Sequence, residues 1–282
     1  MPLYTSAALY GASVFDNCRA WHADAASLVY GLAEHIERFK ESAEEALLTL
    51  PSDAEITAGI WAVLRRCRGR TFVRVRMLAY GTGHDIGSRQ SSLSVFALPV
   101  AGYAPAAPHL MTTKTVRRAE GDLPRALKSP STYLRVRRDV VAAREAGYDD
   151  LVVLNEHQRV SEATRSNIVM VKDGTLCTPP LNEGALPGIT KRILRRLAVE
   201  DGIPWEERPI HRKELDQAEA LLLTSSSLGV VVADSLDGRR FGPSPLAAQI
   251  QRRYTRLPEE HPDHECLTSL ADEPTSSPEE AL

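Results

Sequence analysis

Residues 186–191 read Leu-Pro-Gly-Ile-Thr-Lys, and an amphipathic helical pattern follows them directly. Pro187 is typical of the residues that introduce a helix, so the helix is expected to begin close to Ile189. The first N–H groups of a helix have no partner within it, and together with the helix dipole they favour an anion such as a phosphate. The stretch therefore predicts either a phosphate-binding helix start, formed by Ile189 and Thr190, or a simple N-cap.

Short apolar strands are expected on both sides of this helix. Residues 168–171 and 175–178 flank Lys172-Asp173-Gly174, which is the signal of a β-hairpin. Further strands are predicted over residues 151–154, 220–223 and 230–232, and a helix over residues 131–146. Strands and helices mixed in this way predict an α/β (α+β) fold.

The first hundred residues have a different pattern. Helices are predicted over residues 25–49, ending before Pro51, and over residues 53–66, after a cap at Ser52. Strands are predicted over residues 71–80 and 92–100. A stretch rich in Ala, Gly and Pro then begins at residue 101 and indicates a boundary between two domains. We expect an N-terminal domain over residues 1–104, a linker over 105–112, a larger domain over 113–254 and a disordered acidic tail over 255–282.

Composition excludes several classes of protein. The chain has 282 residues with 43% hydrophobic and 25% charged residues, which is ordinary for a soluble globular protein. Eight of the 37 acidic residues follow Arg256, where no Lys or Arg occurs, so 29 remain against 34 basic residues. This scattered surplus is too small to indicate nucleic-acid binding. The four cysteines are far apart, no membrane span or metal motif is present, and we expect a cytoplasmic protein with reduced thiols.

Several polar residues near the predicted strand and helix ends are candidates for chemistry. Taken singly, each has an ordinary explanation. Lys128 is typical of a surface lysine, Glu162 of a solvated acid near a strand, and Arg38 of a solvated helix arginine. The run from Thr224 to Ser227 is typical of a polar turn. Spacing alone does not separate these explanations from functional ones.

Order and spacing together are more specific. From about Tyr10 to Phe241 the chain resembles the class IV aminotransferases. This fold-type IV family uses pyridoxal 5'-phosphate (PLP) and contains branched-chain aminotransferases, D-amino acid transaminases and aminodeoxychorismate lyases. The segments that carry the resemblance are Tyr-Gly-Ala-Ser-Val-Phe-Asp-Asn-Cys-Arg at 10–19, His35 with Arg38, Lys128 with Tyr133, Glu162 with Asn167, and residues 186–191. The resemblance implies a small N-terminal α/β domain, here with a shortened start, and a larger C-terminal pseudo-barrel domain.

The resemblance also implies roles for individual residues. PLP requires a lysine for its Schiff base, an acid at the pyridine nitrogen and donors for its phosphate. Lys128 would supply the first and Glu162 the second, while Tyr133 would lie near the ring hydroxyl. The remaining cofactor-binding residues would hold the phosphate: Arg38, Ile189, Thr190, Ser225 and Ser226.

The expected substrate residues are Tyr10, Phe15, Arg74, Arg76, Arg165 and Ser227. Arg74 and Arg76 are two residues apart on a predicted strand, so their side chains share one face and suit a carboxylate partner, either in the substrate or within the protein. The chain departs from the family pattern at Asp16-Asn17, where Glu-Gly is usual, and at Arg165-Ser166. Arg165 either binds a substrate carboxylate or points outward.

The function implied is transfer of an amino group between an amino acid and a 2-oxo acid. Two alternatives stay open at this point: an aminodeoxychorismate lyase that gives 4-aminobenzoate and pyruvate, and a PLP-binding homologue without catalysis. The resemblance also implies a homodimer whose site is partly closed by the second subunit.

Overall fold

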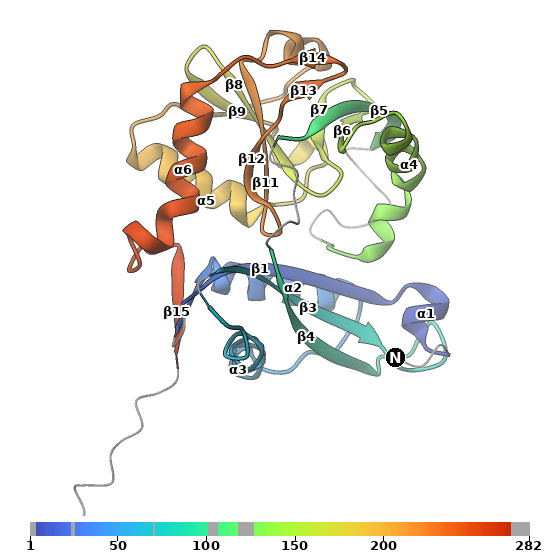
Figure 1. The fold of residues 1–282 in the computed structure, drawn as a ribbon. Coiled ribbons are helices and arrows are strands. Elements are labelled where there is room, and N and C mark those ends of the chain that lie inside the picture. Colours follow the sequence, from blue (N-terminus) through green and yellow to red (C-terminus); the bar gives the residue numbers. More distant parts are fainter. Residues whose placement is uncertain (1–3, 24–25, 70, 101–106, 118–126, 272–282) are drawn as a thin grey trace, which may run out of the picture.

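Three five-stranded sheets form the framework of the part of the chain that the structure describes (Figure 1). The structure is a computed structural model, and it describes residues 4–23, 26–69, 71–100, 107–117 and 127–271. The first sheet has the order β15 (Leu267–Ala271), β2 (Ala26–Tyr30), β1 (Ser13–Ala23), β3 (Thr71–Gly81), β4 (Ser91–Pro99). The second has the order β10 (Trp205–Glu207), β9 (Thr175–Thr178), β8 (Asn167–Lys172), β11 (Ala220–Ser225), β12 (Gly229–Val232). The third has the order β14 (Arg239–Arg240), β13 (Ser235–Leu236), β5 (His109–Arg117), β6 (Asp150–Asn155), β7 (Val160–Ala163).

Helices cover these sheets and connect them. The α-helices are α1 (Ser6–Tyr10), α2 (Leu32–Glu45), α3 (Asp53–Leu64), α4 (Arg137–Glu145), α5 (Ile189–Glu200) and α6 (Pro245–Glu260). Short 3-10 helices are η1 (Pro130–Leu134), η2 (Leu181–Glu183) and η3 (Arg212–Gln217). Among the described residues no helix combines the length and the apolar character that crossing a membrane requires. The mixed α/β fold predicted from the sequence is confirmed.

The two faces of strand β1 have different environments. Val14, Cys18 and Ala20 are buried in a core that includes Phe39 of α2 and Ile60 of α3. The alternate residues of β1 lie on the opposite face. In register with β3, Asn17 pairs with Arg76 and Arg19 with Arg74, so the middle of this second face is polar, with Phe15 and Trp21 on either side. One face of the sheet therefore supports the N-terminal half, and the other is available to a site.

The predicted helix over residues 25–49 is wrong in its first part. Residues Ala26–Tyr30 form β2, which pairs with β1 and β15, and Gly31 with φ +55° precedes α2. The segment is too short for its periodicity to separate strand from helix, so pairing with distant strands decides its structure. The helix predicted over 53–66 is confirmed, because Ser52 and Glu55 form a reciprocal capping box at its start.

Two expected boundary segments also differ from the prediction. Residues 109–112, assigned to the linker, belong to β5, which pairs with β6 and β13; residues 101–106 lie outside the described residues. The tail predicted to be disordered from residue 255 continues α6 to Glu260 and then forms β15 on the edge of the first sheet. The acidic composition predicted disorder, but residues 255–260 form the amphipathic end of α6, in which Leu257 is fully buried. Residues 272–282 lie outside the described part.

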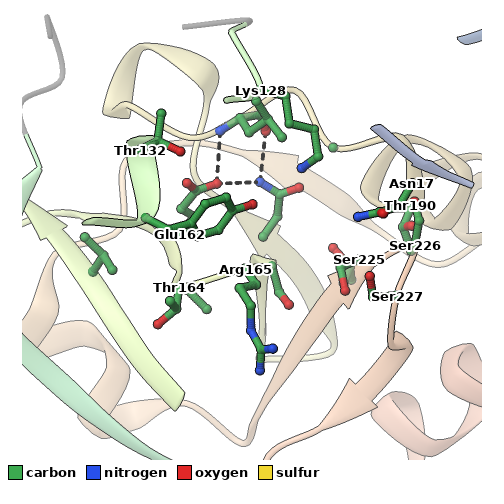
Figure 2. Close-up of a pocket in the computed structure, with 18 of the residues that line it drawn as sticks. Asn17, Lys128, Thr132, Glu162, Thr164, Arg165, Thr190, Ser225, Ser226 and Ser227 are labelled. Atoms are coloured by element: carbon green, nitrogen blue, oxygen red, sulfur yellow. Dashed lines mark hydrogen bonds between the residues drawn. The ribbon is translucent and has the colours of Figure 1, made fainter. Parts of the chain in front are cut away.

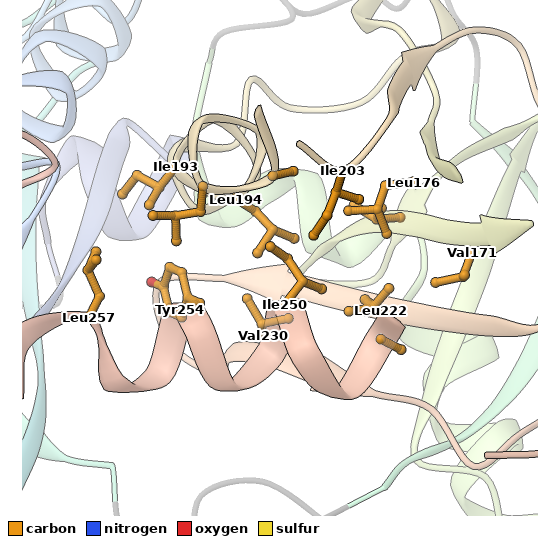
Figure 3. Packing of buried hydrophobic residues seen from close by; sticks show 14 of the residues in the cluster. Val171, Leu176, Ile193, Leu194, Ile203, Leu222, Val230, Ile250, Tyr254 and Leu257 are labelled. Carbon is orange, nitrogen blue, oxygen red and sulfur yellow. The ribbon is translucent and has the colours of Figure 1, made fainter. Parts of the chain in front are cut away.

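Helices α5 and α6 pack on the second sheet through one apolar core (Figure 3). Leu194 of α5, Ile250 of α6 and Leu222 of β11 are fully buried there. Strands β8 and β9 form the expected hairpin, with Met170 opposite Cys177, and α5 begins at Ile189 as predicted. This packing fixes the start of α5 beside the end of β11, where the polar run 224–227 lies.

Candidate active site

A cavity of about 400 Å³ lies between the polar face of the first sheet and the two C-terminal sheets. Its lining comes from β1 and β3, from the segment that contains Lys128, from the β7–β8 region, from the start of α5 and from the turn after β11. Figure 2 shows Lys128 and Glu162 on one side of the cavity and Thr190, Ser225 and Ser226 on the other. Residues far apart in the sequence therefore meet in one concave site.

Lys128 is held by its backbone on both sides. Its N–H donates to Ser42 Oγ at 3.1 Å, and its carbonyl accepts from the N–H of Phe15 at 3.0 Å. The Lys128 amine lies 5.1 Å from the centre of the Phe15 ring. Desolvation, reinforced by the positive charge of Arg38, lowers the pKa of Lys128 to about 8. A substantial fraction of this amine is therefore neutral near physiological pH, as a nucleophile or base requires.

Glu162 on β7 is oriented by neighbours on two other segments. Its carboxylate accepts from the N–H of Leu186 at 3.0 Å and from Asn167 Nδ2 at 3.4 Å. Asn167 Nδ2 also donates to the Leu186 carbonyl at 2.9 Å. A Cβ on Gly188 would lie 1.7 Å from Asn167 Oδ1, so only glycine permits this close approach. The carboxylate of Glu162 is thereby fixed beside the loop that leads into α5.

The start of α5 offers anion-binding donors to the cavity. Its N-cap, Gly188, makes no side-chain cap hydrogen bond, and Ile189 and Thr190 line the cavity. Ser225, the last residue of β11, and Ser226, in the turn that follows, line the same end (Figure 2). Free helix N–H groups beside hydroxyls and an arginine, here Arg38, match the needs of a phosphate.

Arg38 is tied to the fully buried carboxylate of Asp16. Arg38 donates to Asp16 through Nε and Nη2, each at 2.8 Å, and to the Pro187 carbonyl through Nη1 at 2.7 Å. His35 Nδ1 lies 2.8 Å from Asp16 Oδ1. Burial alone would raise the pKa of Asp16, but Arg38 and His35 outweigh it and hold this pKa well below its usual range. The ion pair therefore connects β1, α2 and the residue before α5.

Positive charge dominates the cavity wall. The described lining includes Glu162 as its one carboxylate. The cationic side chains in the same lining are Arg38, Arg74, Arg76, Lys128, Arg135 and Arg165. Arg76 donates to Asn17 Oδ1 at 2.9 Å and stacks 4.6 Å from the Phe15 ring centre. Such a wall suits a ligand with more than one anionic group.

Tyr133 completes the neighbourhood of Lys128. Its ring lies 6.0 Å from that of Phe15. Burial, reinforced by Glu162, raises the pKa of Tyr133 to about 12. The phenol therefore keeps its proton across the physiological range and acts as a hydrogen-bond donor.

The structure brings together nearly all of the site residues expected from the sequence. Those that line the cavity are Phe15, Arg38, Arg74, Arg76, Lys128, Tyr133, Glu162, Arg165, Ile189, Thr190, Ser225, Ser226 and Ser227. Tyr10 is the exception: it ends α1 and is 53% exposed, outside this chain's own cavity. Its position reflects the outward face of a five-residue helix. The arginines of β3 share one face, as expected.

Other residues of the site were not identified from the sequence. Asn17, Thr132, Arg135 and Thr164 line the cavity, and Ser42 positions Lys128. Asp16 was noticed only as a departure from the family motif, whereas it is the buried partner of Arg38. The available signal was a carboxylate in a strand whose neighbours on the same face, Val14 and Cys18, are apolar, since a buried acid needs a cationic partner.

The cavity fits PLP on two structural grounds. Buried hydroxyls of Thr164, Ser166 and Thr224 line it, and none has a hydrogen-bond partner among the described residues. Furthermore, the open start of α5 and the lysine lie in the same cavity as a carboxylate. A phosphate-bearing cofactor with a reactive carbonyl and a basic ring nitrogen would use all three features.

Comparison with known proteins agrees with this geometry. The sequence profile of the amino-transferase class IV family matches residues 13–236. The chain therefore belongs to the class IV aminotransferases. A branched-chain-amino-acid aminotransferase of Escherichia coli K12 is 27% identical over 267 residues, covering 88% of this chain and 84% of the relative.

Solved structures give the same result. The branched-chain aminotransferase of Thermoproteus uzoniensis with norvaline superposes with a TM-score of 0.87 at 27% identity, covering 95% of this chain and 93% of that one. A second branched-chain amino acid aminotransferase, complexed with N-(5'-phosphopyridoxyl)-L-glutamate, gives 0.86 at 25% identity, with coverage of 95% and 92%. The chain is a PLP-dependent aminotransferase, as the sequence predicted.

The Asp16–Arg38 pair gives a prediction about stability. Asp16→Asn leaves Arg38 buried without its counter-charge, so the free energy of unfolding should fall by about 3–5 kcal/mol. Because the pKa of Asp16 lies below its unfolded value of roughly 3.9, this contribution is present above about pH 4 and is lost as the pH falls further. Urea unfolding of the cofactor-free protein at several pH values measures this free energy.

The matched control is an exposed ion pair. Arg256 and Glu260 lie one helical turn apart at 3.5 Å on the surface, and Glu260→Gln should change the free energy of unfolding by about 0–1 kcal/mol. Similar losses of unfolding free energy in the two variants would show that the buried Asp16–Arg38 pair stabilises the fold no more than a surface pair does.

Proposed function

We propose that this cavity is the active site, and that it transfers an amino group between an amino acid and a 2-oxo acid with PLP held by Lys128. The observation that carries the proposal is the position of Lys128. An amine whose pKa is lowered to about 8 shares one cavity with Glu162 and with the open start of α5. No other lysine in the described part of the lining has this setting.

Each residue has a role that its environment supports. Arg38, Ile189, Thr190, Ser225 and Ser226 would hold the cofactor phosphate, and Glu162 would hold the proton of the pyridine nitrogen. Tyr133, protonated, would donate to the ring hydroxyl. When bound, PLP withdraws electrons from the substrate Cα. Neutral Lys128 would take the proton from that Cα and would deliver it to the cofactor carbon.

We propose that one of the two substrates is a dicarboxylic amino acid with its 2-oxo acid, and that the other is aliphatic. Arg74, Arg76 and Arg165 lie in the wall beyond the proposed ring site and suit carboxylates. Phe15 and Ser227 would contact the rest of the substrate. Two similar structures, with norvaline and with a phosphopyridoxyl-glutamate, support this pairing.

The proposal predicts how cofactor attachment depends on pH. The neutral amine of Lys128 is the nucleophile, so the rate of covalent attachment of PLP should rise about tenfold per pH unit and level off above about pH 8. Stopped-flow absorption with cofactor-free protein measures this rate. With a lysine of ordinary pKa, the attachment rate would continue to rise up to a pH of roughly 10.4.

Substitution of Lys128 provides the companion test. Lys128→Ala should lose both the borohydride-trapped PLP adduct, seen by mass spectrometry, and transamination of an amino-donor panel. Lys191→Arg, which changes the buried lysine next to Thr190 outside the cavity lining, should retain both. An adduct that persists in Lys128→Ala contradicts the proposal. Pyruvate released from aminodeoxychorismate without any amino acceptor would instead support a lyase.

The arginine wall predicts a selective loss of activity. Arg76→Gln and Arg165→Gln should each lower kcat/KM for 2-oxoglutarate by about tenfold or more, because a hydrogen bond between charged groups is worth roughly 1.5–3 kcal/mol. The value for an aliphatic 2-oxo acid should fall much less. Steady-state kinetics with both acceptors decides the matter, and equal losses would count against carboxylate binding. Arg240→Ala, on the exposed β14, is the control.

We propose that the chain forms a homodimer through α1 and the turn at residues 83–87. Tyr4, Leu9, Tyr10 and Ile86 are 66%, 45%, 53% and 78% exposed, an apolar surface of the kind that partners cover. The Tyr4 and His84 rings, 5.3 Å apart, join the segment before α1 to this turn. In such a dimer the substrate role expected for Tyr10 would be exercised in the partner subunit's cavity.

Analytical ultracentrifugation tests the dimer. The mass should be twice the 31.0 kDa of one chain, and Ile86→Asp should shift the species toward one chain. A single-chain mass for the unaltered protein at micromolar concentration would refute the proposal.

We propose a cytoplasmic location, because all four cysteines are free, as in a reducing compartment; cell fractionation tests it. We also propose two domains, which meet at the segment between β4 and β5, and limited proteolysis at that segment tests the division.

A further inference from the structure

A chain of hydrogen bonds runs from the buried interior to the cavity wall. Asp16 Oδ1 lies 2.8 Å from His35 Nδ1, and His35 Nε2 lies 3.1 Å from Ser226 Oγ. Asp16 is fully buried and His35 is 1% exposed, whereas Ser226 lines the cavity at its proposed phosphate end. The three residues come from β1, α2 and the turn after β11, so the chain joins both halves of the molecule.

The positions of the protons in this chain follow from Asp16. Its carboxylate already accepts from Arg38 and from the N–H of Asn17, and its strongly lowered pKa keeps it ionised. An ionised carboxylate can only accept, so Nδ1 of His35 must carry a proton. If His35 is neutral, Nε2 is an acceptor and Ser226 must donate to it. The Ser226 hydroxyl then has no proton to offer to the cavity.

That arrangement conflicts with a bound phosphate. Phosphate oxygens are acceptors, so Ser226 can bind one only with the proton that it gives to His35. We propose that His35 is a positioning residue that takes up a proton at Nε2 when the cofactor phosphate binds, so that His35 donates to Ser226 and Ser226 donates to the phosphate. One proton passes from solvent to Nε2, and the O–H of Ser226 turns from His35 to a phosphate oxygen. The inference rests on the phosphate position proposed above.

The charges around His35 make this exchange responsive to an anion. The charged groups that face it are Asp16 on β1, Arg38 on its own helix and Lys128 before η1, while the turn of Ser226 contributes hydroxyls. Burial, reinforced by Arg38 and Lys128 against the opposing effect of Asp16, lowers the pKa of His35. A dianion placed beyond Ser226 acts in the opposite direction, because it favours a second positive charge on the ring.

Calorimetry on the full-length, cofactor-free protein tests the inference with pyridoxamine phosphate, which binds without a covalent bond to lysine. Titrations near neutral pH in buffers of different ionisation enthalpy count the protons taken up. The unaltered protein should take up roughly one more proton per site than His35→Gln. Pyridoxamine, which lacks the phosphate, should show no such difference. His22→Gln is the matched control. His22 is buried on β1, its Nδ1 lies 2.9 Å from Ser27 Oγ, and it does not line the cavity.

Equal proton uptake by the unaltered protein and His35→Gln overturns the inference. Ser226→Ala separates it from the proposed phosphate position. This variant should bind pyridoxamine phosphate more weakly and pyridoxamine equally, and unchanged binding of both would show that the phosphate lies elsewhere.

If His35→Gln does not fold, nitrogen NMR of histidine-labelled, unaltered protein gives the answer. Nε2 of His35 should change from unprotonated to protonated on saturation with pyridoxamine phosphate. An Nε2 that stays unprotonated in the saturated complex overturns the inference.

Discussion

The buried carboxylate of Asp16 is the interaction on which the two halves of the molecule depend. It neutralises Arg38, which in turn donates to the carbonyl of Pro187, the residue that leads into α5 through Gly188. Packing reinforces the same junction, since Gly31 before α2 approaches Ile189 so closely that a Cβ would lie 2.6 Å from its side chain. A single buried charge thus sets the position of α2 relative to the start of α5. The proposed phosphate site lies where those two helices meet, so its geometry depends on this pair.

The same electrostatics explain why the cavity is reactive. Several arginines and Lys128 converge there with Glu162, an arrangement that is unfavourable without an anionic ligand. Desolvation and Arg38 lower the pKa of Lys128 to about 8, whereas burial and Glu162 raise that of Tyr133 to about 12. Two neighbouring groups that ordinarily titrate within about half a unit of each other are driven apart. In the proposed mechanism Lys128 is therefore available as the base at the substrate carbon, and Tyr133 remains the hydrogen-bond donor to the cofactor ring.

Local signals determined which parts of the structure could be predicted. The capping box of Ser52, the β8–β9 hairpin and the start of α5 depend on neighbouring residues, and all three agree with the sequence. Strands β2 and β15 depend on pairing with each other, which no local pattern contains. The site divides in the same way. Lys128 and Glu162 stand in recognisable motifs, whereas the contact of His35 with Ser226 joins residues from opposite halves.

The two ends of the cavity differ in how well the sequence predicts them, because they are built from different parts of the chain. The proposed cofactor end combines side chains such as Lys128 and Glu162 with backbone geometry, namely the helix N–H groups, the close approach at Gly188 and the carbonyl of Pro187. Backbone geometry leaves few sequence solutions, so its motif is readable from one chain. The proposed substrate end is made of side chains from β3 and from the β7–β8 loop, where backbone geometry restricts the residue type less. Arg165 illustrates this, since it departs from the family pattern and still lines the cavity. Substrate choice can therefore differ from that of the relatives while the cofactor chemistry stays constant.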